Sequence, residues 1–235
     1  MTMSSNGASE TGVTSIAANP RRGESLALAR KLIAAYAPLG RRTQLYVALR
    51  LLTAPLIRTA RLFPPGGRVL DLGCGHGIFA HLLHETGPER QVVGVDLMAN
   101  RIEAARRTAP ADGRLSFAVG DARAFPEGPF DVIACIDLLH HMPWEAQVQL
   151  LRLAVDALPP GGTLIVKDLE RRPYWKFAYH YVQDWIMYRF QPLFFRSRED
   201  MTGLLEGLGL EVTMQSLAAG PYPHIAYLAR RKRAA

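Results

Sequence analysis

A glycine-rich run near the middle of the chain has the composition of a ligand-binding turn. Residues 69–77 read Val-Leu-Asp-Leu-Gly-Cys-Gly-His-Gly, so Asp71 precedes Gly73, Gly75 and Gly77 at the end of an apolar stretch. Glycines let the backbone turn sharply after a strand and approach a ligand closely, and the N–H groups of the next helix point toward that ligand. The run therefore predicts a strand, a turn against a ligand and the start of a helix.

Further acidic residues follow other apolar stretches that read as strands, and they are Asp96, Asp121 and Asp137. Ligands of open α/β sheets bind at the carboxyl ends of the strands, so we expect these side chains near the glycine turn. A carboxylate at position 96 is suited to accept hydrogen bonds from two ribose hydroxyls. It is also suited to cap a helix expected at 99–107, and the sequence leaves both roles open.

Two histidines and a fourth acid are candidates for proton transfer. His140 and His141 follow Asp137, and Asp168 ends the strand expected at 163–167. An imidazole titrates near neutral pH, so either histidine is suited to accept a proton from a substrate hydroxyl. Either is also suited to bond the backbone or cap the next helix. Asp168 would position or deprotonate an acceptor, or cap the helix that follows.

The order of these motifs over residues 67–168 resembles that of the class I S-adenosylmethionine-dependent methyltransferases. Their first motif reads acid, any residue, Gly-x-Gly-x-Gly, as it does here from Asp71 to Gly77. The fingerprint of nicotinamide-dependent oxidoreductases, one alternative, has its third glycine where this chain has Ile78. A second alternative is a scaffold that binds the methyl donor and acts through protein interaction.

The resemblance implies a methyltransferase with S-adenosyl-L-methionine as cofactor, and it implies a role for each motif. Asp121 would bind the adenine amine, and Asp137 or the carbonyl of Ile136 would bind the donor's ammonium group. His140, His141 and Asp168 become the expected catalytic residues. The expected donor-binding residues are Asp71, Gly73, Cys74, Gly75, Gly77, Asp96, Leu97, Asp121, Ala122 and Asp137.

Apolar stretches and helical patterns alternate from residue 67 to residue 168, which predicts a parallel sheet covered by helices on both faces. The last two strands, 211–215 and 224–228, have no full helix between them, so we expect an antiparallel pair at one sheet edge. The fold class is therefore α/β, a doubly wound, seven-stranded, mostly parallel sheet with an antiparallel last strand.

The polar residues 1–20 are expected to form a flexible arm, and residues 21–66 to form N-terminal helices that act as a lid or cap. Residues 67–235 would form the Rossmann-like methyltransferase domain. No signal sequence is apparent at the N-terminus, and no window reaches the roughly 18 uncharged apolar residues of a membrane span. A cytoplasmic location, with peripheral membrane contact as an option, is expected.

A helical insertion at 170–196 contains half of the aromatic residues of the chain. In the resembled family an insertion after the fifth strand covers the acceptor, so this one implies a small hydrophobic or lipid-like acceptor. Methylation of oxygen is favoured, with carbon or nitrogen open. Tyr174, Phe177 and Tyr181 are expected to bind the acceptor, although an aromatic stripe also suits a core or a homodimer face.

The net charge of +7 lies outside the middle of the chain, because residues 1–66 carry +7, residues 67–168 carry −4 and residues 169–235 carry +4. Basic flanks around a neutral-to-acidic centre fit attraction to an anionic membrane surface or to an anionic substrate. Nucleic acid is disfavoured as a partner, since the chain has no separate recognition domain. Cys74 and Cys135 lack the paired spacing of a metal site, so no metal is expected.

Overall fold

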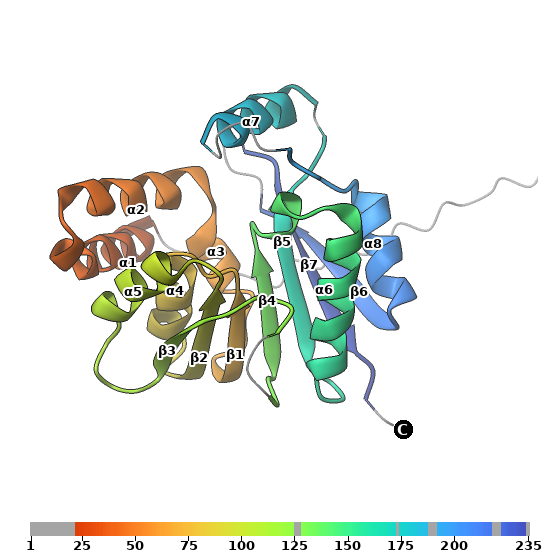
Figure 1. The fold of residues 1–235 in the computed structure, drawn as a ribbon, viewed down its shortest axis with the longest axis horizontal. Helices are drawn as coiled ribbons and strands as arrows, with labels where there is room; N and C mark the ends of the chain where they lie inside the picture. The colour runs from red at the N-terminus through yellow and green to blue at the C-terminus, as the bar shows by residue number, and fades with distance from the viewer. Residues whose placement is uncertain (1–21, 125–127, 173, 188–191, 218–221, 234–235) are drawn as a thin grey trace, which may run out of the picture.

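The computed structural model describes residues 22–124, 128–172, 174–187, 192–217 and 222–233 (Figure 1). Within them seven strands form one sheet in the order β3-β2-β1-β4-β5-β7-β6. The arm expected at 1–20 lies outside the described residues. The strands are β1 (Gly66–Leu72), β2 (Glu89–Asp96), β3 (Leu115–Val119), β4 (Val132–Ile136), β5 (Thr163–Leu169), β6 (Leu210–Ser216) and β7 (His224–Arg231).

Strand direction agrees with the predicted fold class. The pairs β2–β3, β1–β2, β1–β4 and β4–β5 are parallel, whereas β7 runs antiparallel to both β5 and β6. The expected antiparallel pair at the sheet edge is confirmed, with β7 inserted between β5 and the edge strand β6. The doubly wound α/β prediction is therefore confirmed.

Helices cover both faces of the sheet. The helices are α1 (Arg22–Ala35), α2 (Arg41–Thr53), α3 (Leu56–Ala60), α4 (Ile78–Thr86), α5 (Ala99–Thr108), α6 (Trp144–Ala157), α7 (Tyr174–Met187) and α8 (Arg198–Gly207), with short 3-10 turns η1 (Ala37–Leu39) and η2 (Leu139–His141).

Two apolar clusters fill the space between the sheet and these helices. One joins α1–α5 to one face, and the other joins α6 and α8 to the opposite face. Neighbouring residues Val69 and Leu70 of β1 belong to different clusters and are both fully buried. A strand buried on both faces is apolar without alternation, and this explains the continuous apolar stretches of the sequence.

The N-terminal helices pack against the glycine turn as part of the first cluster. Tyr36 at the end of α1 is fully buried, and its hydroxyl donates a hydrogen bond of 2.8 Å to the backbone carbonyl of His76. Val47 of α2 is also fully buried. The helices before residue 66 therefore share a core with the sheet and lie over its glycine turn.

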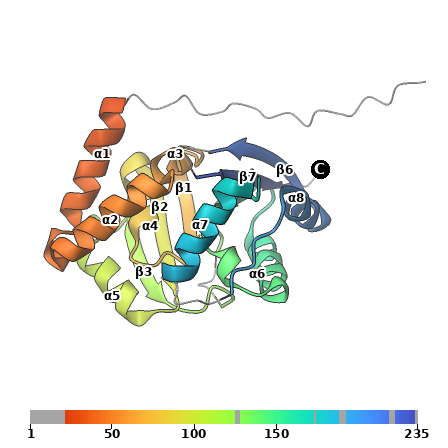
Figure 2. The ribbon, with the colours of Figure 1, turned by 90° about the horizontal axis from the view of Figure 1, so that it is seen from above.

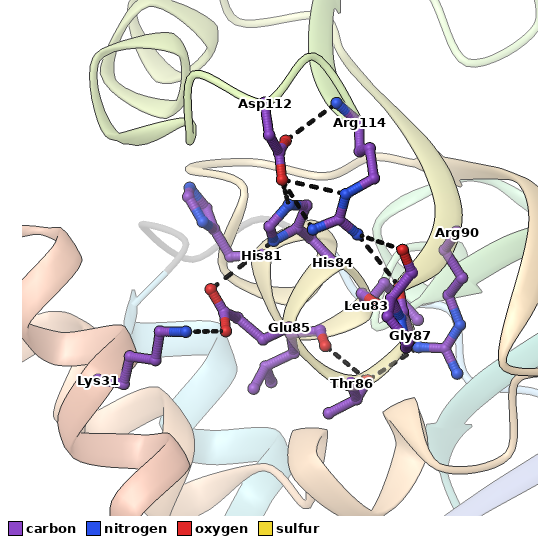
Figure 3. Close-up of polar contacts among 12 residues, drawn as sticks. Lys31, His81, Leu83, His84, Glu85, Thr86, Gly87, Arg90, Asp112 and Arg114 are labelled. Carbon is purple, nitrogen blue, oxygen red and sulfur yellow. Dashed lines mark hydrogen bonds and ion pairs between the residues drawn. The ribbon is translucent and has the colours of Figure 1, made fainter.

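A buried arginine joins α3, α4 and β2 on the same face. Arg90 is 1% exposed, and its guanidinium donates to the carbonyls of Pro64, Phe63 and Leu83 and to the hydroxyl of Thr86 at 2.6–2.9 Å. Figure 3 shows this arginine beside the last turn of α4. It satisfies carbonyl groups at the end of a helix that lack an intrahelical partner.

Helix α7 follows β5 and lies above the carboxyl edge of the sheet, as does α2 (Figure 1). Viewed from above, α7 crosses over the sheet with α2 beside it (Figure 2). The two segments expected as lids, one N-terminal and one after the fifth strand, therefore occupy the edge at which ligands bind in open α/β sheets.

Candidate active site

The glycine turn between β1 and α4 requires glycine at three positions. Gly73, Gly75 and Gly77 have φ values of 71°, 56° and 79°, a region that side chains disfavour. A β-carbon at Gly73 would lie 2.5 Å from Leu138, and one at Gly77 would lie 2.6 Å from the ring of Phe117. Nothing lies within 4 Å of such a carbon at Gly75, so this part of the turn borders open space.

Asp96 holds the turn from the end of β2. Its Oδ2 accepts a hydrogen bond of 2.9 Å from the backbone N–H of Gly75, and its Oδ1 accepts one of 2.9 Å from that of Met98. The N-cap residue of α5 is Met98, without a side-chain cap. A carboxylate accepts about four hydrogen bonds, so Asp96 retains capacity for two hydroxyls of a ligand.

Asp71 brings an unsatisfied carboxylate oxygen to the same place. Its side chain is 1% exposed, and its Oδ2 has no hydrogen-bond partner among the described residues. Burial, with a smaller contribution from Asp96, raises the pKa of Asp71 to about 8. Buried polar atoms are nearly always paired, so this oxygen is suited to meet a polar or positively charged group of a ligand.

Asp137 has the one positive φ value, 52°, among the non-glycine residues that the structure describes. Its carboxylate lies 2.6 and 2.8 Å from Nζ of the fully buried Lys167 and 3.0 Å from Nη2 of Arg50 in α2. Burial alone would raise the pKa of Asp137, but the two cations hold it well below its usual range. Asp137 was expected to receive the ammonium group of the donor. In the structure, its carboxylate already faces two cations, Arg50 and Lys167.

A pocket beneath the N-terminal helices joins the glycine turn, Asp71 and Asp137, whereas Asp96 contacts the turn through Gly75 and does not line the pocket. The glycine turn, Asp71 and Asp137 line it from the sheet, and Tyr46, Arg50 and Leu56 line it from α2 and α3. Sequence reasoning did not identify these helical residues as part of the site. Arg50 and Asp137 lie 87 positions apart, and no local pattern connects them.

The residues expected around the adenine lie at the ends of β2 and β3. Leu97 is 69% exposed. Asp121 binds the backbone N–H and the guanidinium of Arg123, with a shortest distance of 2.7 Å, and these bonds lower its pKa. Ala122 packs against the second apolar cluster. Leu97, Asp121 and Ala122 all lie outside the lining of the pocket described above.

A histidine and an aspartate from different elements form a pair at the same edge. Nδ1 of His140 in η2 lies 2.7 Å from Oδ1 of Asp168 at the end of β5, and that oxygen also accepts from the N–H of Leu169. His140 is 3% exposed and stacks on Phe195 with ring centroids 4.5 Å apart. Asp168 therefore fixes the orientation of the His140 imidazole, a contact that differs from the roles expected for it, which were to act on an acceptor or to cap the next helix.

His141 differs from the expectation of a group that titrates near neutral pH. Burial, followed by the neighbouring His140, lowers the pKa of His141 to about 3. Its ring lies 4.1 Å from that of His140. An imidazole with so low a pKa is neutral at pH 7 and is a weak base, whereas the imidazole of His140 is held by a carboxylate.

Aromatic side chains of α7 extend the surroundings of His140. The ring centroid of Phe177 lies 5.1 Å from that of Phe195, and that of Tyr181 lies 6.1 Å away. Phe177, Tyr181 and Phe195 thus form an aromatic cluster beside the histidine. Tyr174, the third residue expected at the acceptor, is 64% exposed and has a different neighbour, Arg172, whose guanidinium lies 5.9 Å from its ring.

Among the residues that the structure describes, no group of three or more His, Cys, Asp or Glu side chains is arranged to hold a metal ion. No helix in the same residues is both long and apolar enough to cross a membrane.

The sequence of the chain is similar to those of known methyltransferases over about half of its length. The chain is 34% identical over 119 residues to a ubiquinone biosynthesis O-methyltransferase of Xanthomonas campestris, covering 48% of each chain. It is 37% identical over 113 residues to a 2-methyl-6-phytyl-1,4-hydroquinone methyltransferase of Synechocystis, covering 46% of this chain and 34% of that one. The matched region thus spans about half or less of these relatives.

The fold comparison reaches further along the chain. An O-methyltransferase family protein of Burkholderia thailandensis superposes with a TM-score of 0.68 at 22% identity, covering 92% of this chain and 68% of that one. The model of the methyltransferase domain family matches residues 42–215. Family and fold are as the glycine motif predicted, and the chain belongs to the class I S-adenosylmethionine-dependent methyltransferases.

Proposed function

We propose that the protein transfers a methyl group from S-adenosylmethionine to a hydroxyl oxygen of a small hydrophobic or lipid-like acceptor. The observation that carries the proposal is the pair of His140 and Asp168 at 2.7 Å, placed beside aromatic side chains at the edge that carries the glycine turn. Two relatives are named for methyl transfer in ubiquinone biosynthesis and to a hydroquinone, and these names support this class of acceptor.

The donor pocket fits S-adenosylmethionine by the chemistry of its groups. Asp96 has remaining lone pairs for the ribose hydroxyls, and the unpartnered Oδ2 of Asp71 is suited to a positive charge. Arg50, which lines the pocket, supplies positive charge suited to the carboxylate of the donor, while the buried Lys167 pairs with Asp137. When bound, the donor supplies a methyl group that its sulfonium has already activated.

The acceptor side requires a base only because a hydroxyl is a poor nucleophile while it keeps its proton. Asp168 accepts the N–H of His140 at Nδ1 and so leaves Nε2 as the basic nitrogen. His140 then accepts the hydroxyl proton at Nε2. Phe177, Tyr181 and Phe195 bind the apolar body of the acceptor and exclude water from the reacting oxygen.

The test is methyl transfer from labelled donor to a panel of phenols and hydroquinones. His140→Gln is expected to lower kcat about a hundredfold or more while the dissociation constant of the donor stays unchanged, because a general base typically contributes 10²–10⁴-fold. His84→Gln is the control, because His84 lies near the end of α4, pairs with Asp112 at 2.8 Å and does not line the pocket, and this variant is expected to keep kcat.

Two results would overturn the proposal. Binding of the donor without transfer to any acceptor would favour a donor-binding scaffold. A product methylated at carbon, with kcat insensitive to His140→Gln, would contradict the role of the histidine as a base for oxygen.

A further inference from the structure

Helix α7 is apolar on two sides, and only one of them faces the aromatic cluster. Phe177 and Tyr181 contact Phe195 on the inner side. Residues on one outer face, spaced at helical intervals, are exposed by 64%, 66%, 50% and 39%, and they are Tyr174, Trp175, Val182 and Trp185. We call these four residues the outer face of α7.

The composition of the outer face is unusual for a helix in contact with water. A solvent-facing stripe ordinarily carries charged or polar side chains, and large apolar residues that gather there mark an interaction site. Tryptophan and tyrosine each have an apolar ring and a polar group, and they are enriched where an apolar phase meets water. The outer face therefore has the chemistry of a lipid–water boundary.

Positive charge lies at one end of the same helix. Arg171 and Arg172 are exposed and directly precede α7, with the Arg172 guanidinium over the ring of Tyr174. Lys176 is half-buried in the first turns of the helix. Basic residues next to an apolar helical face are typical of helices that lie in the interface of an anionic bilayer.

Other exposed large apolar side chains gather at the same edge of the molecule. Leu45, Leu49 and Leu52 form a stripe on α2 with exposures of 61%, 50% and 78%. Helices α2 and α7 both lie above the carboxyl edge of the sheet (Figure 1) and beside one another from above (Figure 2). The apolar exposure is thus concentrated where the active site lies.

We infer that the outer face of α7 docks on an anionic lipid bilayer, with Arg171 and Arg172 at the headgroups. A second copy of the chain is the other candidate occupant, and it is an outcome of the tests below. Anionic lipid is favoured because its headgroups are complementary in charge to Arg171 and Arg172, which lie next to the aromatic residues of the outer face. The inference rests on the proposed function and deepens it, because a bilayer holds lipid-like acceptors.

The test is co-sedimentation of the full chain with vesicles of phosphatidylcholine, with or without about 30% phosphatidylglycerol. We expect binding to the anionic vesicles that weakens as salt rises, because surface charge is screened. Trp175→Ser is expected to weaken binding about tenfold, and Arg171→Gln with Arg172→Gln is expected to remove the preference for anionic lipid.

Val182→Ser has a matched control in Leu26→Ser. Val182 is 50% exposed and Leu26 is 51% exposed, but Leu26 lies on α1, which α2 separates from α7 in Figure 2. Only Val182→Ser should weaken vesicle binding. Equal effects of the two changes, or equal binding to neutral and anionic vesicles, would overturn the inference.

A homodimer would give a different pattern of results. In that case the chain would not bind vesicles, and sedimentation velocity would show a dimer that Trp175→Ser dissociates. These two results together would assign the outer face to a second copy and overturn the inference. Vesicle binding is measured without turnover, so its failure is distinguishable from failure of methyl transfer to a water-soluble acceptor.

Discussion

Asp71 is buried and Asp137 is largely enclosed at the same pocket, yet their surroundings give them opposite protonation behaviour. Burial without a cationic partner raises the pKa of Asp71 to about 8, whereas Lys167 and Arg50 hold the pKa of Asp137 far below that of a free carboxyl. An uncompensated buried charge is costly, and a paired one is not. At pH 7 one carboxyl is therefore protonated and the other ionised.

The state of Asp71 predicts proton release when the donor binds. A positive donor group favours the ionised carboxylate, so below pH 8 the carboxyl must lose close to one proton on binding. Donor affinity should rise with pH up to about 8, by at most tenfold per pH unit, and level off above it. Calorimetry in two buffers of different ionisation enthalpy measures the release directly.

Asp71→Asn provides the control for this linkage. The amide does not titrate, so the variant should bind the donor with no dependence on buffer ionisation enthalpy. Equal proton release by the wild type and the variant would show that another group is responsible.

A change at Asp168 is predicted to affect catalysis and to leave donor binding unchanged. Asp168→Asn removes the carboxylate that holds Nδ1–H of His140 and stabilises the imidazolium formed by proton transfer. We expect kcat to fall about a hundredfold with the dissociation constant of the donor unchanged. Steady-state kinetics with calorimetry separates the two quantities, and a weaker donor complex with normal kcat would contradict the assignment.

Sequence reasoning predicted local structure correctly where residue type and strand position coincide. Asp71, Asp96 and the three glycines follow from a strand that ends in a turn, and each has the local structure expected. Arg50 did not follow, because its role depends on how a helix packs 87 positions away from Asp137. Pairings of this kind are properties of tertiary packing.

For the turn between β1 and α4, two glycines with similar φ values should respond differently to substitution. Gly75→Ala meets backbone strain alone and should cost about 1 kcal/mol, whereas Gly77→Ala also forces a β-carbon against Phe117 and should cost about 2–3 kcal/mol. Urea unfolding measures both changes in the free energy of unfolding. Equal losses of stability would show that the contact with Phe117 is relaxed.

Because Gly75 borders the pocket, Gly75→Ala should also weaken donor binding.

The connection of α3, α4 and β2 depends on one buried cation. Arg90→Met leaves the carbonyls of Phe63, Pro64 and Leu83 without their donor, and we expect a loss of about 3 kcal/mol in the free energy of unfolding. Arg114→Met is the matched control. Its side chain is 32% exposed and pairs with Asp112 on the surface, so its loss should stay below about 1 kcal/mol (Figure 3).

Elements were predictable where hydrophobic pattern alone determines them. The strand expected at 163–167 extends over Thr163–Leu169, and the helix expected at 99–107 extends over Ala99–Thr108. Helix α7 was predicted as an aromatic helix, but its pattern does not reveal which aromatic residues face inward. Phe177 and Tyr174 have similar side chains, and only packing against Phe195 distinguishes them.

Across the whole molecule, one edge of the sheet carries the donor pocket, the His140–Asp168 pair and two helices with exposed apolar stripes. The parallel strands set this arrangement, since their carboxyl ends carry all the loops that contain the motifs. Residues 67–168 contain thirteen acidic residues, and five of them lie in these motifs: Asp71, Asp96, Asp121, Asp137 and Asp168. The positive charge lies in the flanking segments.

The most direct test of the account is transfer of an isotopically labelled methyl group from S-adenosylmethionine to a hydroquinone, with the product identified by mass spectrometry and NMR. The account predicts a labelled methyl ether whose rate of formation falls about a hundredfold in His140→Gln while donor binding persists. Donor binding without any labelled ether, across a panel of hydrophobic hydroxyl compounds, would contradict it.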